Sequence, residues 1–327
     1  MQNLNRYLFL LLLASLSLSS CEKYEICLLE EKSIFPSSNE YVAIFGDIQY
    51  IDDPSHIDIY QRSVDWIVAE IKKGTKIQCV LSTGDLTENN KREQWDCFRH
   101  SMKDLSKIVP YYSIIGDHDY TWYDRILIKN REDTSFNEYV NFPLSTSNIL
   151  ERFESGRLEN IIVRTEIQGK IIKVVLLEFG PRKEVVEWAD TYINSHQEDI
   201  FIIMTHEYLE KGGGRRTSNL MMQNRLRNTS YTTPDELWDK LIKKNNNIIC
   251  VLCGHVDGLY ALTFDTNDYG RDVPQIQHNI QNEEYRYDNW LMLWEIKPQF
   301  DSVKVFIYNT KTSTFYNDNK CLFSFAI

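Results

Sequence analysis

Residues 111–119 read YYSIIGDHD, an apolar run followed at once by a glycine and three residues that can bind metal or carry protons. Residues 41–49, YVAIFGDIQ, and residues 77–85, IQCVLSTGD, repeat this order upstream. Short apolar runs of this kind, bounded by glycine, are typical of buried β-strands. The stretches therefore predict strands that each end in chemically useful side chains.

Amphipathic helices are predicted between these strands. Apolar residues recur there at helical spacing in two stretches, and Gly74 ends the first of them. The first set is Ile57, Tyr60, Val64, Ile67, Val68 and Ile71, and the second is Trp95, Phe98, Met102, Leu105 and Ile108. Strands that alternate with helices through short connections predict a parallel sheet covered by helices.

The later part of the chain predicts a second group of strands. A hairpin is expected over residues 161–179 with its turn at Gly169, and helices are expected to begin near Pro181 and Pro234. Further strands are predicted over residues 200–204, 248–253, 258–264, 290–296 and 303–308. Because no repeat or linker interrupts residues 41–327, we expect them to form a single domain.

Residues that can bind a divalent cation follow five of the predicted strands. They are Asp47 with Gln49, Asp85, Asp117 with His118, His206, and His255 with Asp257. In open α/β sheets, ligands bind beyond the carboxyl ends of the strands, so these side chains are expected to converge on one rim.

This order of motifs resembles the calcineurin-like metallophosphoesterase superfamily. The chain carries Asp-x-Gln, Gly-Asp, Gly-Asp-His-Asp, Thr-His and Gly-His-x-Asp. The usual pattern is Asp-x-His, Gly-Asp, Gly-Asn-His-Asp/Glu, a lone His and Gly-His-x-His. The likeness spans about residues 41–265. It implies a four-layer α/β/β/α sandwich and a hydrolase that cleaves a phosphomonoester or a phosphodiester.

The resemblance also implies two bound divalent metal ions. The first would be bound by Asp47, Gln49, Asp85 and Asp257, and the second by Asp85, Asp117, His206 and His255. His118 would stabilise the transition state or protonate the leaving oxygen, and Asp119 would orient it. Two such ions generate a hydroxide and hold the phosphoryl oxygens for in-line attack.

Three positions depart from the family pattern. Gln49 and Asp257 stand where histidine is usual, and Asp117 stands where asparagine is usual. Four carboxylates would then face the two ions, so the site charge falls from about +2 to near zero and phosphate is attracted less. We favour an active enzyme because the bridging Asp85 remains, together with His118, His206 and His255. The alternatives are a catalytically degenerate, surface-anchored binding protein, or an envelope lipoprotein in which these residues only support loops.

The ligand types also predict which metals bind. The first ion would contact only protein oxygen atoms, and hard oxygen donors favour manganese or magnesium over zinc or iron. Arg215 and Arg216, on the glycine-rich loop at residues 211–216, could grip a substrate phosphate or could be solvated surface. Tyr50, Tyr120 and Tyr208 could line the pocket or could pack in the core. Glu207 could form a hydrogen bond to a metal ligand or could be a surface carboxylate.

Residues 1–21 predict a bacterial lipoprotein signal peptide. An apolar run at residues 7–18 follows Arg6 and is too short to span a bilayer. The run ends in Leu18-Ser19-Ser20-Cys21, which resembles a lipobox and implies lipid attachment to Cys21. Residues 22–40 are expected to be a tether, so the domain would be anchored to a membrane of the cell envelope.

Charge and cysteine content narrow the remaining choices. The formal net charge of −11 disfavours binding to duplex nucleic acid, and we expect a monomer. Cys79, Cys250 and Cys253 are predicted to be core residues, with the last two on opposite faces of one strand. The state of three further cysteines is open: Cys27, Cys97 and Cys321.

Overall fold

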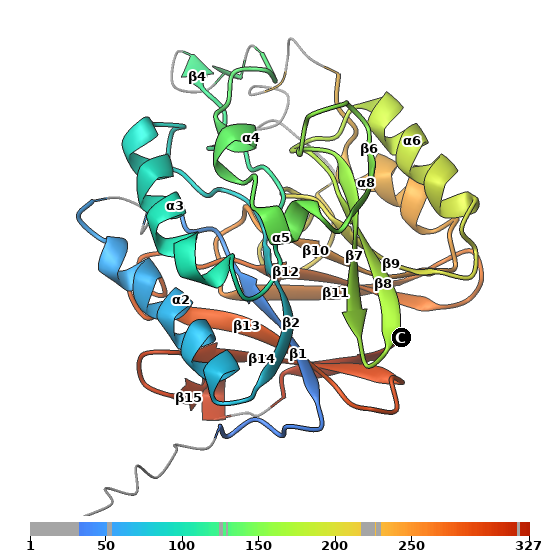
Figure 1. The fold of residues 1–327 in the computed structure, drawn as a ribbon. Coiled ribbons are helices and arrows are strands. Elements are labelled where there is room, and N and C mark those ends of the chain that lie inside the picture. Colours follow the sequence, from blue (N-terminus) through green and yellow to red (C-terminus); the bar gives the residue numbers. More distant parts are fainter. Residues whose placement is uncertain are drawn as a thin grey trace, which may run out of the picture. The chain divides into compact units, whose positions relative to one another are not determined.

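The computed structural model describes residues 33–50, 54–123, 127–128, 130–216, 226, 230–318 and 321–327. Two seven-stranded sheets dominate this part of the chain (Figure 1). The first has the order β15-β14-β13-β1-β2-β3, with β16 paired to β14. Its strands are β1 (Glu40–Phe45), β2 (Lys76–Ser82), β3 (Tyr111–Ser113), β13 (Trp290–Ile296), β14 (Ser302–Asn309), β15 (Thr314–Phe315) and β16 (Phe323–Ala326). As predicted, β1, β2 and β3 are parallel.

The second sheet has the order β11-β12-β10-β9-β8-β7-β6. Its strands are β6 (Ile149–Arg152), β7 (Ile161–Ile167), β8 (Lys170–Leu176), β9 (Ile200–Met204), β10 (Ile248–Cys253), β11 (Tyr260–Thr266) and β12 (Asp272–His278). The predicted hairpin is β7 with β8, and β8, β9, β10 and β12 run parallel to one another. A small separate sheet joins β4 (Trp122–Tyr123) to β5 (Leu127–Ile128).

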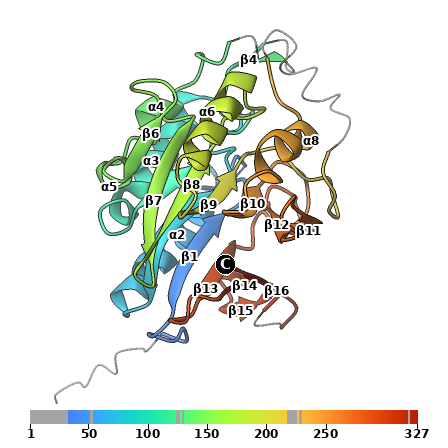
Figure 2. The ribbon, with the colours of Figure 1, turned by 90° about the vertical axis from the view of Figure 1, so that its right-hand side faces the viewer.

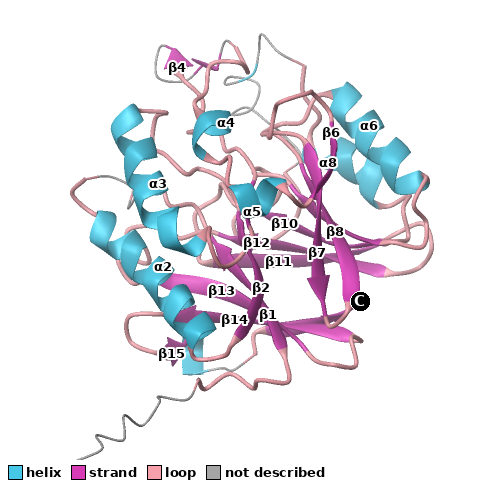
Figure 3. Ribbon diagram, in the orientation of Figure 1, coloured by secondary structure: helices cyan, strands magenta, loops and turns pink. Residues whose placement is uncertain are grey.

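Helices cover the outer faces of the two sheets. Figure 2 shows the ribbon turned by 90°, and Figure 3 distinguishes the helices in cyan from the strands in magenta. Helix α2 packs on the first sheet, where the rings of Tyr60 and of Phe45 on β1 are 5.2 Å apart. The longer helices are α2 (Ile57–Lys72), α3 (Arg92–Leu105) and α6 (Lys183–Asn194). The shorter ones are α4 (Phe136–Tyr139), α5 (Pro143–Thr146), α8 (Pro234–Leu237), the π-helix η1 (Trp238–Ile242) and the 3₁₀ helix η2 (Tyr316–Asp318).

Alternating side chains of the second sheet serve two different hydrophobic cores. On β8, Val174 belongs to the core shared with the first sheet, whereas Val175 belongs to the core under α6, α8 and η1. A strand that is apolar on both faces must lie between two covering layers. The predicted four-layer α/β/β/α sandwich is therefore confirmed. Cys250 and Cys253 divide between the two cores in the same way, as predicted.

The folded part begins before residue 41, where the sequence placed its start. Phe35 is buried and its ring lies 5.4 Å from that of Tyr41. Ser33 donates a 2.6 Å hydrogen bond to Glu70 on α2. Ser33 and Phe35 thus contact the domain, so the folded part reaches into the expected tether, residues 22–40. The predicted signal peptide, Cys21 and residues 22–32 of the tether lie outside the described residues. Among the described residues, no helix combines the length and apolar character needed to cross a membrane.

Strand β12 is one of the elements that the sequence did not predict, together with β4, β5, β6, β15, β16 and the short helices α4 and α5. Gln275 and Gln277 on β12 are fully buried, so its pattern of side chains looks polar. Gln275 donates to Asp265 and accepts from Arg215, and Gln277 donates to the carbonyl of Val256. Buried amides are tolerated when they are hydrogen-bonded. These partners therefore allow a polar strand in the sheet interior.

Candidate metal centre

The predicted ligands follow the carboxyl ends of strands and meet on one rim, as expected. Asp47 follows β1, Asp85 follows β2, Asp117 follows β3, His206 follows β9 and His255 follows β10. The loops are shaped closely around them. A Cβ atom at Gly116 would collide with the carboxylate of Asp85, and one at Gly254 would collide with that of Asp47. Asp85 and His255 themselves have positive φ angles of 48° and 73°, a strain that is common at functional sites.

Four side chains come together in a buried cluster: Asp85, Asp117, His206 and His255. Each offers a ligand atom within 4.8 Å of the others, and all four residues are buried. His206 Nε2 lies 3.2 Å from Asp85 Oδ2 and 3.3 Å from Asp117 Oδ1. His255 Nδ1 lies 3.0 Å from Asp117 Oδ1. These are the residues assigned to the second ion by the sequence, and we call them the buried cluster.

The chemistry of the buried cluster fits a divalent cation. Asp85 Oδ2 and His206 Nε2 are buried and have no hydrogen-bond partner among the described residues, although they face each other. The Nδ1 of His206 lies 2.6 Å from the carbonyl of Thr83, which fixes the ring and turns Nε2 toward the cluster. Such an outer contact commonly orients metal-binding histidines. Two carboxylates and two imidazoles make a mixed donor set that zinc, iron and manganese all accept.

Without a cation, charge in the cluster is balanced by protons. Burial alone would lower the pKa of His206, but Asp85 and Asp47 outweigh it and raise that pKa to about 10. Burial alone would raise the pKa of Asp85, but His206 and His118 hold it well below its usual range. These pKa shifts favour an imidazolium on His206 beside the ionised carboxylate of Asp85. A bound cation would take the place of that proton.

The other predicted ligands form what we call the Asp47 side: Asp47, Gln49 and Asp257. Asp47 is buried, and burial raises its pKa to about 8. Its Oδ2 accepts hydrogen bonds from the backbone of His255 at 2.8 Å and from Asn279 at 2.7 Å. Its Oδ1 accepts from Thr83 at 3.0 Å. The carboxylate is therefore well supplied with donors from the protein.

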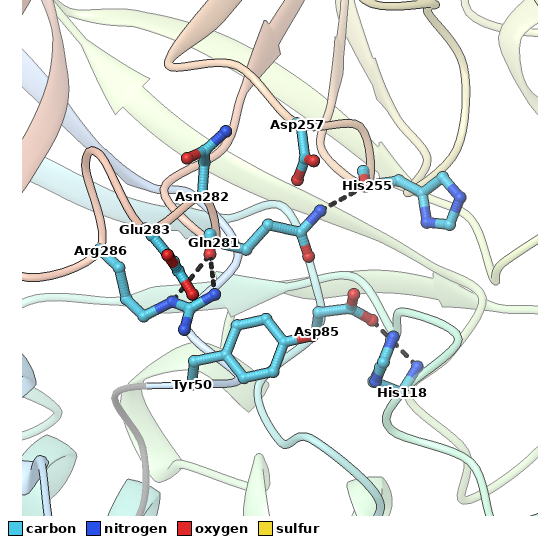
Figure 4. A pocket seen from close by; sticks show the side chains of 9 residues that line it. All are labelled: Tyr50, Asp85, His118, His255, Asp257, Gln281, Asn282, Glu283 and Arg286. Carbon is cyan, nitrogen blue, oxygen red and sulfur yellow. Dashed lines mark hydrogen bonds between the residues drawn. The ribbon is translucent and has the colours of Figure 1, made fainter. Parts of the chain in front are cut away.

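Gln49 and Asp257 complete the Asp47 side less tightly. Gln49 donates a 2.8 Å hydrogen bond to Gln281, and its own Oε1 is buried without a hydrogen-bond partner among the described residues. Asp257 is exposed and lines the cavity over the site. Gln281 also donates to the carbonyl of His255 at 2.7 Å (Figure 4). Its amide thus stands between the Asp47 side and the buried cluster.

His118 and Asp119 both lie at the site, and they have different partners. His118 Nδ1 lies 2.7 Å from the carbonyl of Glu88, and its ring packs 4.3 Å from that of Trp122. The carboxylate of Asp119 instead accepts hydrogen bonds from the backbones of Gly116 and Thr87, both at 2.9 Å. Asp119 therefore fixes the loops around the site. The direct contact that places the imidazole is the carbonyl of Glu88, and the orienting role of Asp119 stays a prediction.

Arg215 and Arg216 do not face the site as free cations. Arg215 forms ion pairs with Asp265 and with Asp235, and its guanidinium lies over the ring of Trp238. Arg216 Nη1 lies 2.9 Å from the buried carboxylate of Glu207, whose Oε1 is also 3.7 Å from His255 Nε2. These carboxylate partners weigh against a phosphate-binding role for the two arginines, which stays untested.

The tyrosines that follow the motifs divide between packing and the site. Tyr120 and Tyr208 are fully buried in the hydrophobic cores. Tyr50 lines a cavity of about 430 Å³ over the site. Asp85, His118, His255 and Asp257 line the same cavity, as Figure 4 shows. Its volume lies within the roughly 300–1,000 Å³ that small-molecule sites occupy.

Several residues of the site were missed by sequence reasoning. Thr83 is part of the strand-end motif that was quoted, but its contacts could not be seen there. Asn279, Gln281 and Arg286 follow β12, a strand that was not predicted. The carbonyl of Glu88 contacts His118 through the backbone, which leaves no mark on the sequence. A prediction of β12 would have placed another strand end, and with it Asn279, on the rim.

Comparisons with known sequences support one family. A sequence model described as calcineurin-like phosphoesterase matches residues 41–257. The uncharacterized protein YvnB of Bacillus subtilis (strain 168) is 22% identical over 315 residues, or 91% of this chain and 22% of that protein. A probable cyclic nucleotide phosphodiesterase of Moraxella catarrhalis (strain BBH18) is 20% identical, over 66% of this chain and 71% of the relative. This chain therefore spans only about a fifth of the Bacillus relative.

Two further comparisons, one with a sequence and one with a solved structure, cover two thirds or more of this chain. A probable glycerophosphodiester phosphodiesterase of Arcobacter nitrofigilis, GpdQ, is 24% identical, over 67% of this chain and 69% of the relative. Among solved structures, a 5'-nucleotidase precursor from Thermus thermophilus aligns with a TM-score of 0.43 at 12% identity. That alignment covers 88% of this chain and 54% of the other.

Proposed function

Because this chain belongs to the calcineurin-like phosphoesterase family, we propose that it hydrolyses a phosphoester with the help of divalent cations at the rim. The observation that carries the proposal is the buried cluster, in which two carboxylates and two imidazoles place ligand atoms within 4.8 Å of one another. A protein that used these residues only to support loops would not be expected to gather so many titratable groups in one buried place.

The buried cluster would hold one cation, through Asp85, Asp117, His206 and His255. Bound divalent cations supply a water-derived nucleophile at neutral pH and offset the charge on the phosphoryl oxygens. A second cation, held by Asp85 with the Asp47 side, stays a prediction: Gln49 offers a buried Oε1 that has no hydrogen-bond partner among the described residues, whereas Asp257 is exposed. The preference for manganese or magnesium rests on the oxygen donors of that side.

We propose that His118 acts on the phosphoryl group. Its Nδ1 donates to the carbonyl of Glu88, and the Glu88 carboxylate lies 3.6 Å from the same nitrogen. These contacts leave Nε2, which lies 3.8 Å from Asp117 Oδ2, directed toward the buried cluster. We propose that His118 acts as the imidazolium: Nδ1–H stays bonded to the Glu88 carbonyl, and Nε2–H donates a hydrogen bond or its proton to the leaving oxygen, which leaves a neutral imidazole. The neighbouring Trp122 ring limits rotation of the imidazole.

A phosphodiester is the substrate class that the comparisons favour within this proposal. The Moraxella and Arcobacter relatives are named as probable phosphodiesterases, of a cyclic nucleotide and of a glycerophosphodiester. Their identities of 20% and 24% are too low to carry a particular substrate to this chain. We therefore propose phosphodiester hydrolysis as the reaction class, with phosphomonoesters as the comparison in any assay.

A second candidate function is metal-dependent binding without turnover. The observation that favours it is the Asp47 side, where Asp257 is exposed rather than gathered with the other ligands.

Both candidates share the proposed location: a cell-envelope protein tethered through a lipid on Cys21. Replacing Cys21 by serine should release the protein from the membrane fraction, because stable anchoring depends on the acyl chains. Retention of that variant in the membrane would contradict the anchor.

One screen tests the reaction. Protein lacking residues 1–21 is stripped with a chelator, reloaded with manganese, magnesium, zinc or iron, and assayed on phosphomonoesters and phosphodiesters. We expect turnover that requires added metal and is highest on a phosphodiester. His118→Ala serves as the background control. Stoichiometric metal binding with no turnover on any substrate would instead support the binding protein, and failure to bind metal would overturn both.

A further inference from the structure

A short turn after β12 brings one arginine into the cavity over the site. The turn is held by hydrogen bonds from the backbone of Arg286 to the carbonyl of Asn282, at 2.8 Å, and from the backbone of Gln281 to Asn279, at 2.7 Å. Asn279 itself donates to Asp47. The position of Arg286 is therefore linked to the metal centre through the residues of this one turn.

The guanidinium of Arg286 is held from two directions. Its Nε and Nη2 both donate to the carbonyl of Gln281, and its plane lies 3.9 Å from the ring centre of Tyr50 (Figure 4). Stacking on an aromatic ring and a shared acceptor orient the fork and limit its loss of entropy on binding. The described residues supply no hydrogen bond to the remaining nitrogen, Nη1, and Arg286 lines the cavity.

Arg286 differs from the other arginines near the site in its charge balance. Arg182, Arg215 and Arg216 each form an ion pair with at least one carboxylate. No carboxylate among the described residues lies within ion-pair distance of Arg286, although Glu283 and Asp257 line the same cavity. A half-buried guanidinium that is oriented but not paired is prepared to receive an anion from outside the protein.

We propose that Arg286, stacked on Tyr50, forms a subsite for a second anionic group of the substrate. This rests on the proposed function and names its substrate class: a phosphodiester that carries a further negative charge, as in a diphosphate diester. Water would attack one phosphorus atom beside His118 and break the phosphoanhydride bond, while the second phosphoryl group is bound by Arg286 and leaves as one of two phosphomonoester products. Gln281 connects the two positions, because it accepts from Gln49, donates to the carbonyl of His255 and accepts from Arg286.

The test compares two substrates and two arginines. UDP-glucose provides a diphosphate diester, and bis(4-nitrophenyl) phosphate provides a phosphodiester with a single negative charge. Arg286→Gln should lower kcat/KM for UDP-glucose by about 10- to 100-fold, the effect of losing a charge-assisted contact, and lower it much less for the other substrate. Arg286→Lys should recover part of that loss. Arg92→Gln, at an exposed position on α3, is the matched control and should match wild type on both.

A binding measurement separates this proposal from the reaction. In manganese-loaded His118→Ala protein, calorimetry should show that Arg286→Gln weakens UDP-glucose binding about 10-fold or more, while Arg92→Gln does not. If UDP-glucose binds as predicted but no phosphoester is hydrolysed by wild type, the proposed function fails and the subsite stands. Equal losses on both substrates, or unchanged binding of UDP-glucose, would overturn the subsite while turnover of bis(4-nitrophenyl) phosphate keeps the reaction.

Discussion

Asp85 would be shared by two groups of predicted ligands, which the fold gathers to different degrees. In the buried cluster, Asp85, Asp117, His206 and His255 place their ligand atoms within 4.8 Å of one another. On the Asp47 side the groups are less closely gathered: Asp47 accepts hydrogen bonds from the protein, and Asp257 is exposed to solvent. Ligand atoms that are already gathered need little rearrangement to bind a cation, so the buried cluster should bind metal more tightly.

The largest effect is expected where the two groups meet. Asp85→Asn removes the carboxylate that both cation positions would share, so retained metal should fall and kcat/KM should drop by about 10³-fold or more. Metal analysis and kinetics on dialysed protein measure both. Asp104→Asn, a similar change at an exposed position on α3, is the control. Wild-type metal content in Asp85→Asn would show that the buried cluster is not the metal centre.

The next effect separates binding of metal from chemistry. His118→Ala should lower kcat by about 10²- to 10³-fold while the metal content stays near that of wild type, because His118 acts on the phosphoryl group. Kinetics and metal analysis are made on the same preparation. Loss of metal in parallel with activity would mean that His118 belongs to the ligand set instead.

A smaller change should sharpen the contrast between the two sides. After dialysis, wild type should retain about one tightly held ion, with activity restored by manganese or magnesium. Asp257→His supplies an imidazole to the Asp47 side, so it should increase retained zinc or iron. Elemental analysis of the two proteins side by side measures this. Wild type that purifies with two tightly held zinc ions would refute the proposed difference between the sides.

The smallest effects on activity are expected from the arginines of the glycine loop. Arg216→Gln should reduce stability by about 3 kcal/mol, because it leaves the buried Glu207 without its ion pair. The melting temperature should fall by roughly 5–10 °C. Arg215→Gln should cost about 1 kcal/mol, because its carboxylate partners are partly exposed. A rise in KM without loss of stability in either variant would support the phosphate-binding role.

The strands and their ends could be predicted because their signals are local. The runs before Asp47, Asp85 and Asp117 are short, apolar and followed by glycine, and the helices between them have a clear period. Parallel strands place their carboxyl ends on one edge, so the convergence of the ligands followed from the order of elements alone. The same reasoning placed Cys250 and Cys253 on opposite faces of β10.

Only the tertiary structure decided which of the gathered side chains are free to act. Arg215 is neutralised by Asp265, which lies 50 residues away in the chain, and Asp119 is bound by two backbone amides. Arg286 is presented to the site by β12, a strand whose buried glutamines hid it from the hydrophobic pattern. A sequence states which groups a chain possesses, through patterns that repeat over a few residues. Whether a charge is paired depends on contacts between distant segments, and those exist only once the sheets have packed.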